Sequence, residues 1–192
     1  MIAVVLAAGR GARMGGVAKA LLAIEGESFL CRIARTLAGA GVDAAVVVVG
    51  PPHGDAVAAE AARLGMAVAH NPAPERGMAS SVATGFSAIA DRDDRAALLW
   101  PVDVARVAPA TVSQVALASG AGLIAVPTWQ GRGGHPSAFG RSLWPELIGC
   151  AELPAGALSV VHRDPGRVCR IAVDDRFILA DVDRPADLEP AP

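Results

Sequence analysis

The chain has 192 residues, a length that suits one domain with a full hydrophobic core. Hydrophobic residues make up 53% of it and aromatic residues only 4%, which favours parallel strands covered by small-residue helices over an aromatic-rich β-sandwich. The formal net charge of −2 creates no broad field that would attract nucleic acid or an anionic membrane, so a polyanion needs a local site.

The cysteines and the chain start predict a cytoplasmic protein. The three cysteines are far apart and form no CxxC pair, which argues against a disulfide framework or a zinc knuckle and favours a reducing compartment. The apolar start has no preceding positive region, and no apolar run is long enough to span a bilayer. We therefore expect no signal peptide and no membrane segment.

Strand-like and helix-like segments alternate from the first residue. The run from Ile2 to Leu6 is typical of a strand buried on both faces, and Ser28 is placed to cap a helix that continues to about Leu37. The other expected strands are 44–49, 67–70, 96–100, 123–126, 168–173 and 178–180. The other expected helices are 55–64, 78–89, one from Pro109 to Gly120, 143–148 and 157–162, with glycine-rich loops at 7–19 and 129–136.

This alternation predicts an α/β fold, a Rossmann-like three-layer α/β/α sandwich with a mostly parallel sheet. No internal repeat or linker divides the sequence, so residues 1–192 are expected to form a single domain. In such sheets a ligand binds outside the carboxyl ends of the strands.

The first loop carries the clearest chemical signal. Residues 6–19 read Leu-Ala-Ala-Gly-Arg-Gly-Ala-Arg-Met-Gly-Gly-Val-Ala-Lys. A glycine-rich turn after a buried strand exposes consecutive backbone N–H groups that bind anions. Arg13 and Lys19 add positive charge, so the combination suits a nucleoside triphosphate whose α-phosphorus is attacked.

Three other interpretations of this loop are weaker. A Walker loop needs Ser or Thr after its lysine, but Lys19 is followed by Ala20. A dinucleotide fingerprint needs an acid at the end of the second strand, and Asp55 lies too far along the chain. A glycine turn with solvated arginines is the third alternative, which the joint presence of glycines, Arg13 and Lys19 right after the first strand disfavours.

The stretch Leu6-Ala7-Ala8-Gly9, followed by Arg13-Met14-Gly15 and Lys19, resembles the signature of the molybdopterin-guanylyltransferase-like superfamily, the MobA-like NTP transferases. Within it the likeness is greatest to the molybdenum cofactor cytidylyltransferases, because cytidylyl-transferring members tend to read Leu-Ala-Ala-Gly and guanylyl-transferring members Leu-Ala-Gly-Gly. The resemblance implies a fold of the nucleotide-diphospho-sugar transferase type.

The same resemblance implies a reaction and its participants. A nucleoside monophosphate, here CMP from CTP, would pass to a phosphorylated acceptor, molybdopterin or molybdenum cofactor, with release of pyrophosphate. Mg²⁺ would be the cofactor. A molybdoenzyme or its chaperone would be a transient protein partner.

Roles for the first loop also follow from the resemblance. Lys19 would neutralise the α-phosphate, and Arg13 would hold the β- and γ-phosphates that leave as pyrophosphate. Ala7 and Ala8 would lie next to the base. The nucleotide-binding residues of this loop are expected to be Leu6, Ala7, Ala8, Gly9, Arg10 and Gly11.

Aspartates are expected to supply the metal ligands. Asp103 follows the strand that ends at Trp100, where a carboxylate is a hard oxygen ligand for Mg²⁺ bridging phosphate oxygens. A loop-capping aspartate is the alternative for this position. The resemblance places the metal aspartate of relatives here, although Val104 and Ala105 replace their Met-Pro or Gln-Pro. Asp183 is the expected second ligand, and Asp181 is the other candidate.

Two serines are candidates for the nucleotide side of the site. Residues 77–82 read Gly-Met-Ala-Ser-Ser-Val and resemble the Gly-Met-Ser-Ser-Ser segment of relatives. Ser80 and Ser81 stand at a helix start, where a hydroxyl either caps the helix or faces a base or ribose.

The acceptor side is expected at residues 131–136, Gly-Arg-Gly-Gly-His-Pro, which resemble the segment that borders the acceptor in relatives. Gly134 and His135 are the acceptor-binding candidates, and the alternative is that His135 only orders its loop. Relatives read Gly-Ala-Arg where this chain has Gly156-Ala157-Leu158, which implies a different acceptor or a different contact.

Other functions stay open at this point. A nearby variant would transfer a nucleotide to a sugar phosphate or an alcohol phosphate. A degenerate relative would bind nucleotide or pterin without turnover; changes near Asp103 and at Arg184 favour this, whereas Arg13, Lys19 and Asp103 argue against it. A nicotinamide dehydrogenase is disfavoured, because this sequence lacks the acidic residue that would bind the ribose.

Overall fold

Strand β1 (Ile2–Leu6) forms the centre of the fold, which the computed structural model describes for residues 1–182 and 187. It pairs in parallel with β4 (Ala44–Val49) on one side and with β6 (Ala96–Pro101) on the other. All five residues of β1 are buried, because Val4 packs into the core on one face of the sheet and Val5 into the core on the opposite face.

The main sheet has the strand order β10-β7-β9-β6-β1-β4-β5 over the described part of the chain, with β8 (Arg132–Gly133) pairing with β7 (Ile124–Trp129). β5 (Ala67–His70) runs parallel to β4, and β10 (Val168–Ala172) runs parallel to β7. β9 (Ser137–Gly140) lies antiparallel between β6 and β7. The mostly parallel sheet is as predicted, and the reversed strand β9 in its interior is an addition.

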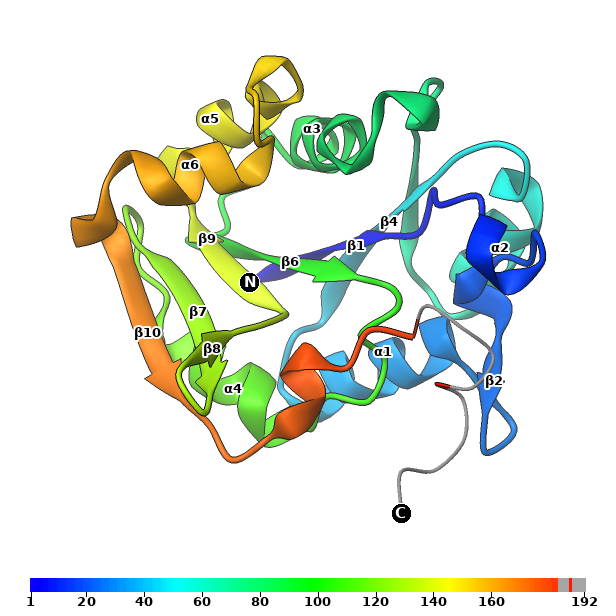
Figure 1. The fold of residues 1–192 in the computed structure, drawn as a ribbon, viewed down its shortest axis with the longest axis horizontal. Coiled ribbons are helices and arrows are strands. Elements are labelled where there is room, and N and C mark those ends of the chain that lie inside the picture. The colour runs from blue at the N-terminus through cyan, green and yellow to red at the C-terminus, as the bar shows by residue number, and fades with distance from the viewer. Residues whose placement is uncertain (183–186, 188–192) are drawn as a thin grey trace.

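Helices cover both faces of the sheet and give the three-layer α/β/α sandwich that the sequence predicted (Figure 1). The layer on one face consists of α1 (Phe29–Gly39), α2 (Gly54–Arg63) and α4 (Pro109–Ala118). The layer on the other face consists of α3 (Met78–Ala88), α5 (Trp144–Ile148) and α6 (Ala157–Arg163).

Helix α1 begins where the sequence predicted, because the hydroxyl of Ser28 accepts a hydrogen bond from the backbone N–H of Cys31 at 3.1 Å. A small hairpin of β2 (Ala23–Ile24) and β3 (Glu27–Ser28) precedes this helix. Short 3-10 helices occupy Ala12–Met14 (η1), Lys19–Leu21 (η2), Pro74–Arg76 (η3), Arg141–Leu143 (η4), Cys150–Glu152 (η5), Pro165–Arg167 (η6) and Arg176–Leu179 (η7).

Two expected elements differ in the structure. The strand expected at 178–180 is wrong, because η7 occupies this segment: Asp175 accepts hydrogen bonds from the Phe177 N–H and the Thr111 hydroxyl, which holds the backbone in a turn. The loop expected at 129–136 contains β8, which folds back on β7 as a short hairpin. Contacts between residues far apart in the sequence determine the backbone conformation of both segments.

No helix in the described residues is long and apolar enough to cross a lipid bilayer.

Gly85 sets how closely helix α3 approaches the sheet. A Cβ at this position would overlap Cγ1 of Val4 and lie 2.8 Å from Cγ2 of Val48. Both valines are completely buried, and β-branched side chains are stiff about χ1, so neither can move away easily. The glycine therefore allows α3 to pack directly on β1 and β4.

We expect Gly85→Ala to destabilise the protein by about 1–3 kcal/mol through overpacking, despite the gain in helix propensity of about 1 kcal/mol. Urea denaturation followed by circular dichroism measures the change. Gly149→Ala is the matched control, because its Cβ would lie 3.6 Å from the nearest atom. Equal stability of both variants would contradict the close packing of α3.

Candidate functional site

The loop after β1 presents free backbone donors at the carboxyl edge of the sheet. The N–H groups of residues 8–11 donate to no other described residue. Gly11 turns the chain at φ 61°, and a Cβ there would overlap the carbonyl oxygen of Val17. Met14 and Gly16 donate to the Gly11 carbonyl at 2.8 and 3.0 Å, which closes the loop into a concave turn. Such a turn binds an anion through its backbone.

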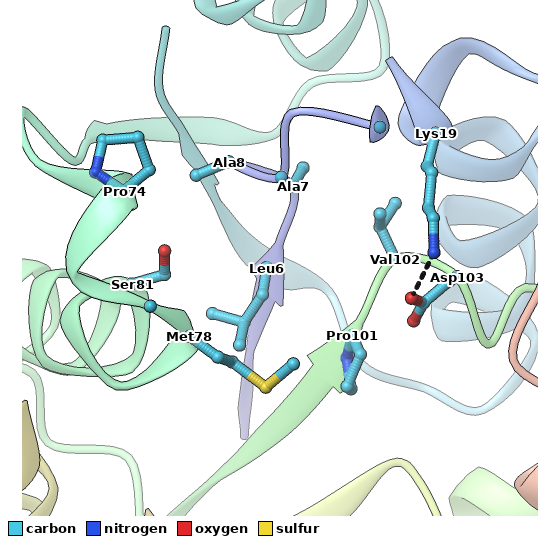
Figure 2. Close-up of a pocket in the computed structure, with 13 residues that line it drawn as sticks. Leu6, Ala7, Ala8, Lys19, Pro74, Met78, Ser81, Pro101, Val102 and Asp103 are labelled. Carbon is cyan, nitrogen blue, oxygen red and sulfur yellow. Dashed lines mark hydrogen bonds and ion pairs between the residues drawn. The ribbon is translucent and has the colours of Figure 1, made fainter. Parts of the chain in front are cut away.

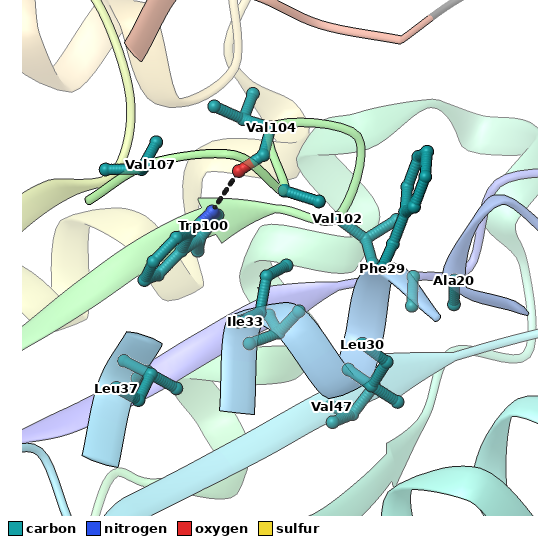
Figure 3. Packing of buried hydrophobic residues seen from close by; sticks show 14 of the residues in the cluster. Ala20, Phe29, Leu30, Ile33, Leu37, Val47, Trp100, Val102, Val104 and Val107 are labelled. Atoms are coloured by element: carbon teal, nitrogen blue, oxygen red, sulfur yellow. Dashed lines mark hydrogen bonds between the residues drawn. The ribbon is translucent and has the colours of Figure 1, made fainter. Parts of the chain in front are cut away.

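The turn after β6 places Asp103 beside this loop. The indole N–H of Trp100 donates to the carbonyl of Val104 at 2.8 Å, and Trp100 is fully buried against α1 (Figure 3). The backbone N–H of Val102 donates to Leu6 at 3.1 Å, which ties the turn to the end of β1. Trp100 and the buried residues Val104 and Ala105 hold this turn without the proline of relatives.

Lys19 and Asp103 form an ion pair at 3.0 Å between the first loop and the β6 turn (Figure 2). Both side chains are about four-fifths buried, with exposed fractions of 17% and 22%. Lys19 is the only lysine of the chain, in which all other basic residues are arginine or histidine. A compact ammonium group and a carboxylate therefore stand together at the edge where open α/β sheets usually bind their ligands.

A cavity of about 260 Å³ opens between the first loop, the β6 turn and the start of α3 (Figure 2). Eight of the predicted site residues line it: Leu6, Ala7, Ala8, Gly9, Gly11, Lys19, Ser81 and Asp103. The structure thus brings together residues that are up to 97 positions apart, between Leu6 and Asp103. Arg10 is exposed and does not line the cavity.

The two serines of α3 have different surroundings. Ser81 lines the cavity, whereas Ser80 is buried outside its lining, and its hydroxyl donates to the carbonyl of Gly77 at 2.8 Å. The side-chain amide of Asn71 donates to both hydroxyls, at 2.9 and 3.0 Å. Asn71 also accepts from the N–H of Ala73 at 3.0 Å. This asparagine therefore ties the loop before α3 to the helix start.

A second cavity of about 670 Å³ continues from the first across β9, β7 and β10. The two cavities share Leu6, Gly77, Met78 and Pro101 in their walls, so they form one cleft along the sheet. The predicted acceptor residues Gly134 and His135 line the larger part. Its position beside Asp103 is the one expected for a second substrate.

His135 is held in its neutral form. Burial lowers the pKa of its imidazole from the ordinary value of 6.5. The negative charges of Asp103 and Asp181 oppose this shift without cancelling it, and so does a hydrogen bond with the backbone of Leu99. The Nδ1 atom is buried without a hydrogen-bond partner in the described part of the chain.

The carboxylate oxygens near Asp103 suit a divalent cation that also binds phosphate oxygens. The backbone N–H of Val182 donates to the carbonyl of Asp103 at 3.1 Å, which brings Asp181 to the same edge of the cleft. Residues 1–182 and 187 contain no group of three metal-ligating side chains. Mg²⁺ needs only one or two carboxylates when phosphate oxygens and water complete its coordination.

Two of the predicted site side chains lie outside the described part of the chain. The predicted second metal ligand, Asp183, lies outside the described residues. Arg13 belongs to the turn η1, and its side chain is likewise outside the described part of the chain.

Sequence reasoning missed two residues that position the site. Asn71 directly follows β5, so its place at the carboxyl end of a parallel strand was a usable signal. From the sequence, Trp100 is predicted to be an ordinary core residue. Only its hydrogen bond to the turn that carries Asp103 reveals its positioning role.

The α/β fold and the residues gathered at the carboxyl edge of its sheet are those expected of a nucleotide-transferring enzyme, and comparison with known proteins shows the family. The chain belongs to the MobA-like NTP transferase domain family, which matches residues 3–168. It is accordingly a nucleotidyltransferase of this family. No curated protein matches the chain significantly.

Solved structures support the assignment. A nucleotidyl transferase from Methanothermobacter thermautotrophicus has a TM-score of 0.82 at 24% identity, over 97% of this chain and 93% of that chain, which shows a shared fold. Rv0371c from Mycobacterium tuberculosis H37Rv has a TM-score of 0.76 at 28% identity, over 97% and 94%. A structure of Rv0371c in complex with manganese has a TM-score of 0.70 at 25% identity, over the same fractions.

The lowered pKa of His135 predicts a pH dependence of stability. Because the folded state resists protonation of this ring, its contribution to stability is present above pH 6.5 and is lost as the pH falls below it. The slope from one such group is at most about 1.4 kcal/mol per pH unit. Denaturant unfolding between pH 7.5 and 5 should show a shallower slope for His135→Gln than for the wild type.

His70→Gln is the control for this measurement, because His70 is an exposed imidazole at the end of β5. It should retain the wild-type slope. A His135→Gln slope identical to that of the wild type would show that the ring is not kept neutral by burial.

Proposed function

We propose that this chain transfers CMP from CTP to the phosphate of an acceptor of the molybdopterin or molybdenum cofactor type, with release of pyrophosphate. The observation that carries the proposal is the Lys19–Asp103 pair at 3.0 Å beside the free N–H groups of residues 8–11. Backbone donors, one cation and one carboxylate at a shared edge match the needs of phosphoryl chemistry, in which positioning and charge neutralisation supply most of the catalysis.

The phosphates of CTP would lie against the first loop. The N–H groups of residues 8–11 would hold their oxygens, and Lys19 would turn from Asp103 toward the α-phosphate. An oxygen of the acceptor phosphate then attacks the α-phosphorus in line, the bond to the bridging oxygen breaks, and pyrophosphate leaves. Arg13 is proposed to hold the leaving pyrophosphate.

Asp103, with Asp181 or Asp183, would hold Mg²⁺. The ion would supply positive charge for the phosphate oxygens of substrate and leaving group. Once Lys19 contacts the phosphates, the Asp103 carboxylate becomes available as a ligand. The donor chemistry of Asp103 and Asp181 supports this assignment, and the manganese complex of Rv0371c is consistent with a divalent ion in such a fold.

Ala8 and Pro74 line the smaller cavity, and we propose that they lie next to the base. Ala8 and Pro74 converge around Gly50: an added Cβ on Gly50 would lie 3.3 Å from the Ala8 methyl group and 3.2 Å from the Pro74 ring. The methyl group of Ala8 therefore occupies space that a glycine would leave open. We propose that this methyl group favours the smaller base, a pyrimidine.

The acceptor would occupy the larger cavity, with its phosphate near Asp103. Gly134 and His135 are proposed to border that phosphate, and a neutral imidazole there adds hydrogen-bonding capacity without a fixed charge. The continuity of the two cavities at Leu6 and Pro101 lets the two substrates meet.

Lys19→Ala should keep the fold and lower pyrophosphate release at least about a hundredfold, because one preorganised charge at a phosphate has this effect on catalysis. Pyrophosphate release with CTP and molybdopterin measures turnover, and circular dichroism checks the fold. Arg35→Ala, which removes an exposed cation on α1, should retain wild-type turnover. Unchanged turnover in Lys19→Ala would rule out its role.

The single lysine also permits a chemical test. Pyridoxal 5′-phosphate followed by borohydride should modify Lys19, and CTP with Mg²⁺ should protect it. The other primary amine, at Met1, is ion-paired with Asp94 at 2.9 Å. Peptide mass spectrometry reads the site, and modification that CTP leaves undiminished would contradict nucleotide binding at this loop.

Base choice is tested by thermal shift with CTP, GTP and ATP. A ligand that binds the folded state at a hundred times its Kd stabilises it by about 2.7 kcal/mol, so the midpoint of unfolding should rise with CTP and Mg²⁺. We expect smaller shifts with GTP and ATP, and a smaller CTP shift in Ala8→Gly. A shift with a purine nucleotide alone overturns the base assignment, and no shift at all supports a degenerate relative.

A further inference from the structure

The wall of the larger cavity is apolar and carries positive charge without negative charge. Its fixed positive charges are Arg76 and Arg170, its histidines are His135 and His162, and no Asp or Glu lines it among the described residues. Arg76 is already paired with Glu152 at 2.6 Å. A cavity of this composition favours a ligand that is an anion with an apolar body.

Of the two arginines in this wall, Arg170 is the one whose guanidinium forms no ion pair or hydrogen bond with another described residue. It is an exposed residue of its strand, so its charge is accessible to a ligand. It lies on β10, on the same face as Val168, which packs against the core of the α3–α5–α6 layer, whereas Ile171 packs against the opposite core. Alternation along the strand therefore directs Arg170 to the cavity face of the sheet.

The neighbouring hairpin leaves room for this guanidinium. A Cβ on Gly133 would lie 3.6 Å from a terminal nitrogen of Arg170 and 3.1 Å from Cγ1 of Val126. The backbone of β8 thus approaches Arg170 at the end of the cavity farthest from Asp103. His162 of α6 lines the same cavity.

Strand order gives the separation between the two charged ends. β6, which leads to Asp103, and β10, which carries Arg170, are three strand positions apart in the order β6-β9-β7-β10. Three strand spacings of about 4.8 Å amount to about 14 Å across the sheet. An anion at Arg170 is therefore distinct from the phosphate that reacts beside Asp103.

We infer that the acceptor carries a second anionic group, such as an oxyanion, besides its reacting phosphate, and that Arg170 binds this group at the far end of the larger cavity. The inference rests on the proposed function, since it assigns the reacting phosphate to the Asp103 end. Arg170 is thereby the residue that selects acceptors with two separated negative charges. A guanidinium suits this role because its planar donors bind such oxyanions in pairs.

The walls between the two ends are apolar. Met78 and Leu158 line the cavity with exposed fractions of 64% and 58%, unusually high for large hydrophobic side chains. Val126 and Val161 add apolar surface on the sheet and on α6. The body of the acceptor that joins its two anions therefore presents an apolar or flat surface.

Two synthetic probes test the inference without knowledge of the natural acceptor. Biphenyl-4-yl phosphate carries an anion at one end only, and 4′-carboxybiphenyl-4-yl phosphate carries one at each end. Isothermal titration in the absence of nucleotide should show the carboxylated probe binding the wild type about tenfold tighter, as expected of one charge-assisted pair. In Arg170→Gln the two probes should bind equally, and Arg170→Lys should regain part of the preference.

Arg132→Gln is the matched control, because Arg132 is an exposed cation on β8 outside the cavity wall and its loss should leave the preference intact. A preference that persists in Arg170→Gln overturns the inference, as does equal binding of the probes to the wild type or binding of neither. The thermal shift with CTP separates the two proposals: if CTP shifts both wild type and Arg170→Gln while no probe preference exists, nucleotide binding stands and the role of Arg170 fails.

Discussion

The double pairing of β1 is the constraint on which the site depends. Its parallel ladders with β4 and β6 bring Leu6 beside Val48 and Pro101, so the first loop leaves the sheet next to the β6 turn. The bond from Val102 to the Leu6 carbonyl extends this register into the turn. Lys19 and Asp103 are thus brought within 3.0 Å, although 84 positions separate them in the chain.

The reversed strand β9 shapes the second half of the cleft. By pairing antiparallel with both β6 and β7, it moves β7 and β10 one strand farther from the first loop. These strands together form a wide wall of the larger cavity, and residues of α6 line the same cavity. The small cavity suits a nucleotide, and the wide wall suits a longer second substrate whose far end reaches β10.

Buried polar side chains hold two loops of the site in place. The indole of Trp100 fixes the turn that carries Asp103, and the amide of Asn71 joins the loop before α3 to the two serines. Each is almost completely buried, so its hydrogen bonds are made in a low dielectric and are costly to break. Preorganisation of this kind is what phosphoryl chemistry requires, because little reorganisation remains at the moment of reaction.

The sequence by itself determined the α/β class and six of the ten strands that the structure describes, and it singled out the glycine-rich loop after β1, because apolar runs, the Ser28 cap and glycine spacing are local signals. The tertiary structure alone decided that β9 enters the sheet reversed, that 176–179 is a 3-10 helix, that Ser80 faces inward while Ser81 lines the cavity, and that Arg170 reaches the same cleft as His135. These features depend on partners distant in the chain, such as Asp175 with Thr111 and Asn71 with both serines, and no local pattern encodes a partner of that kind.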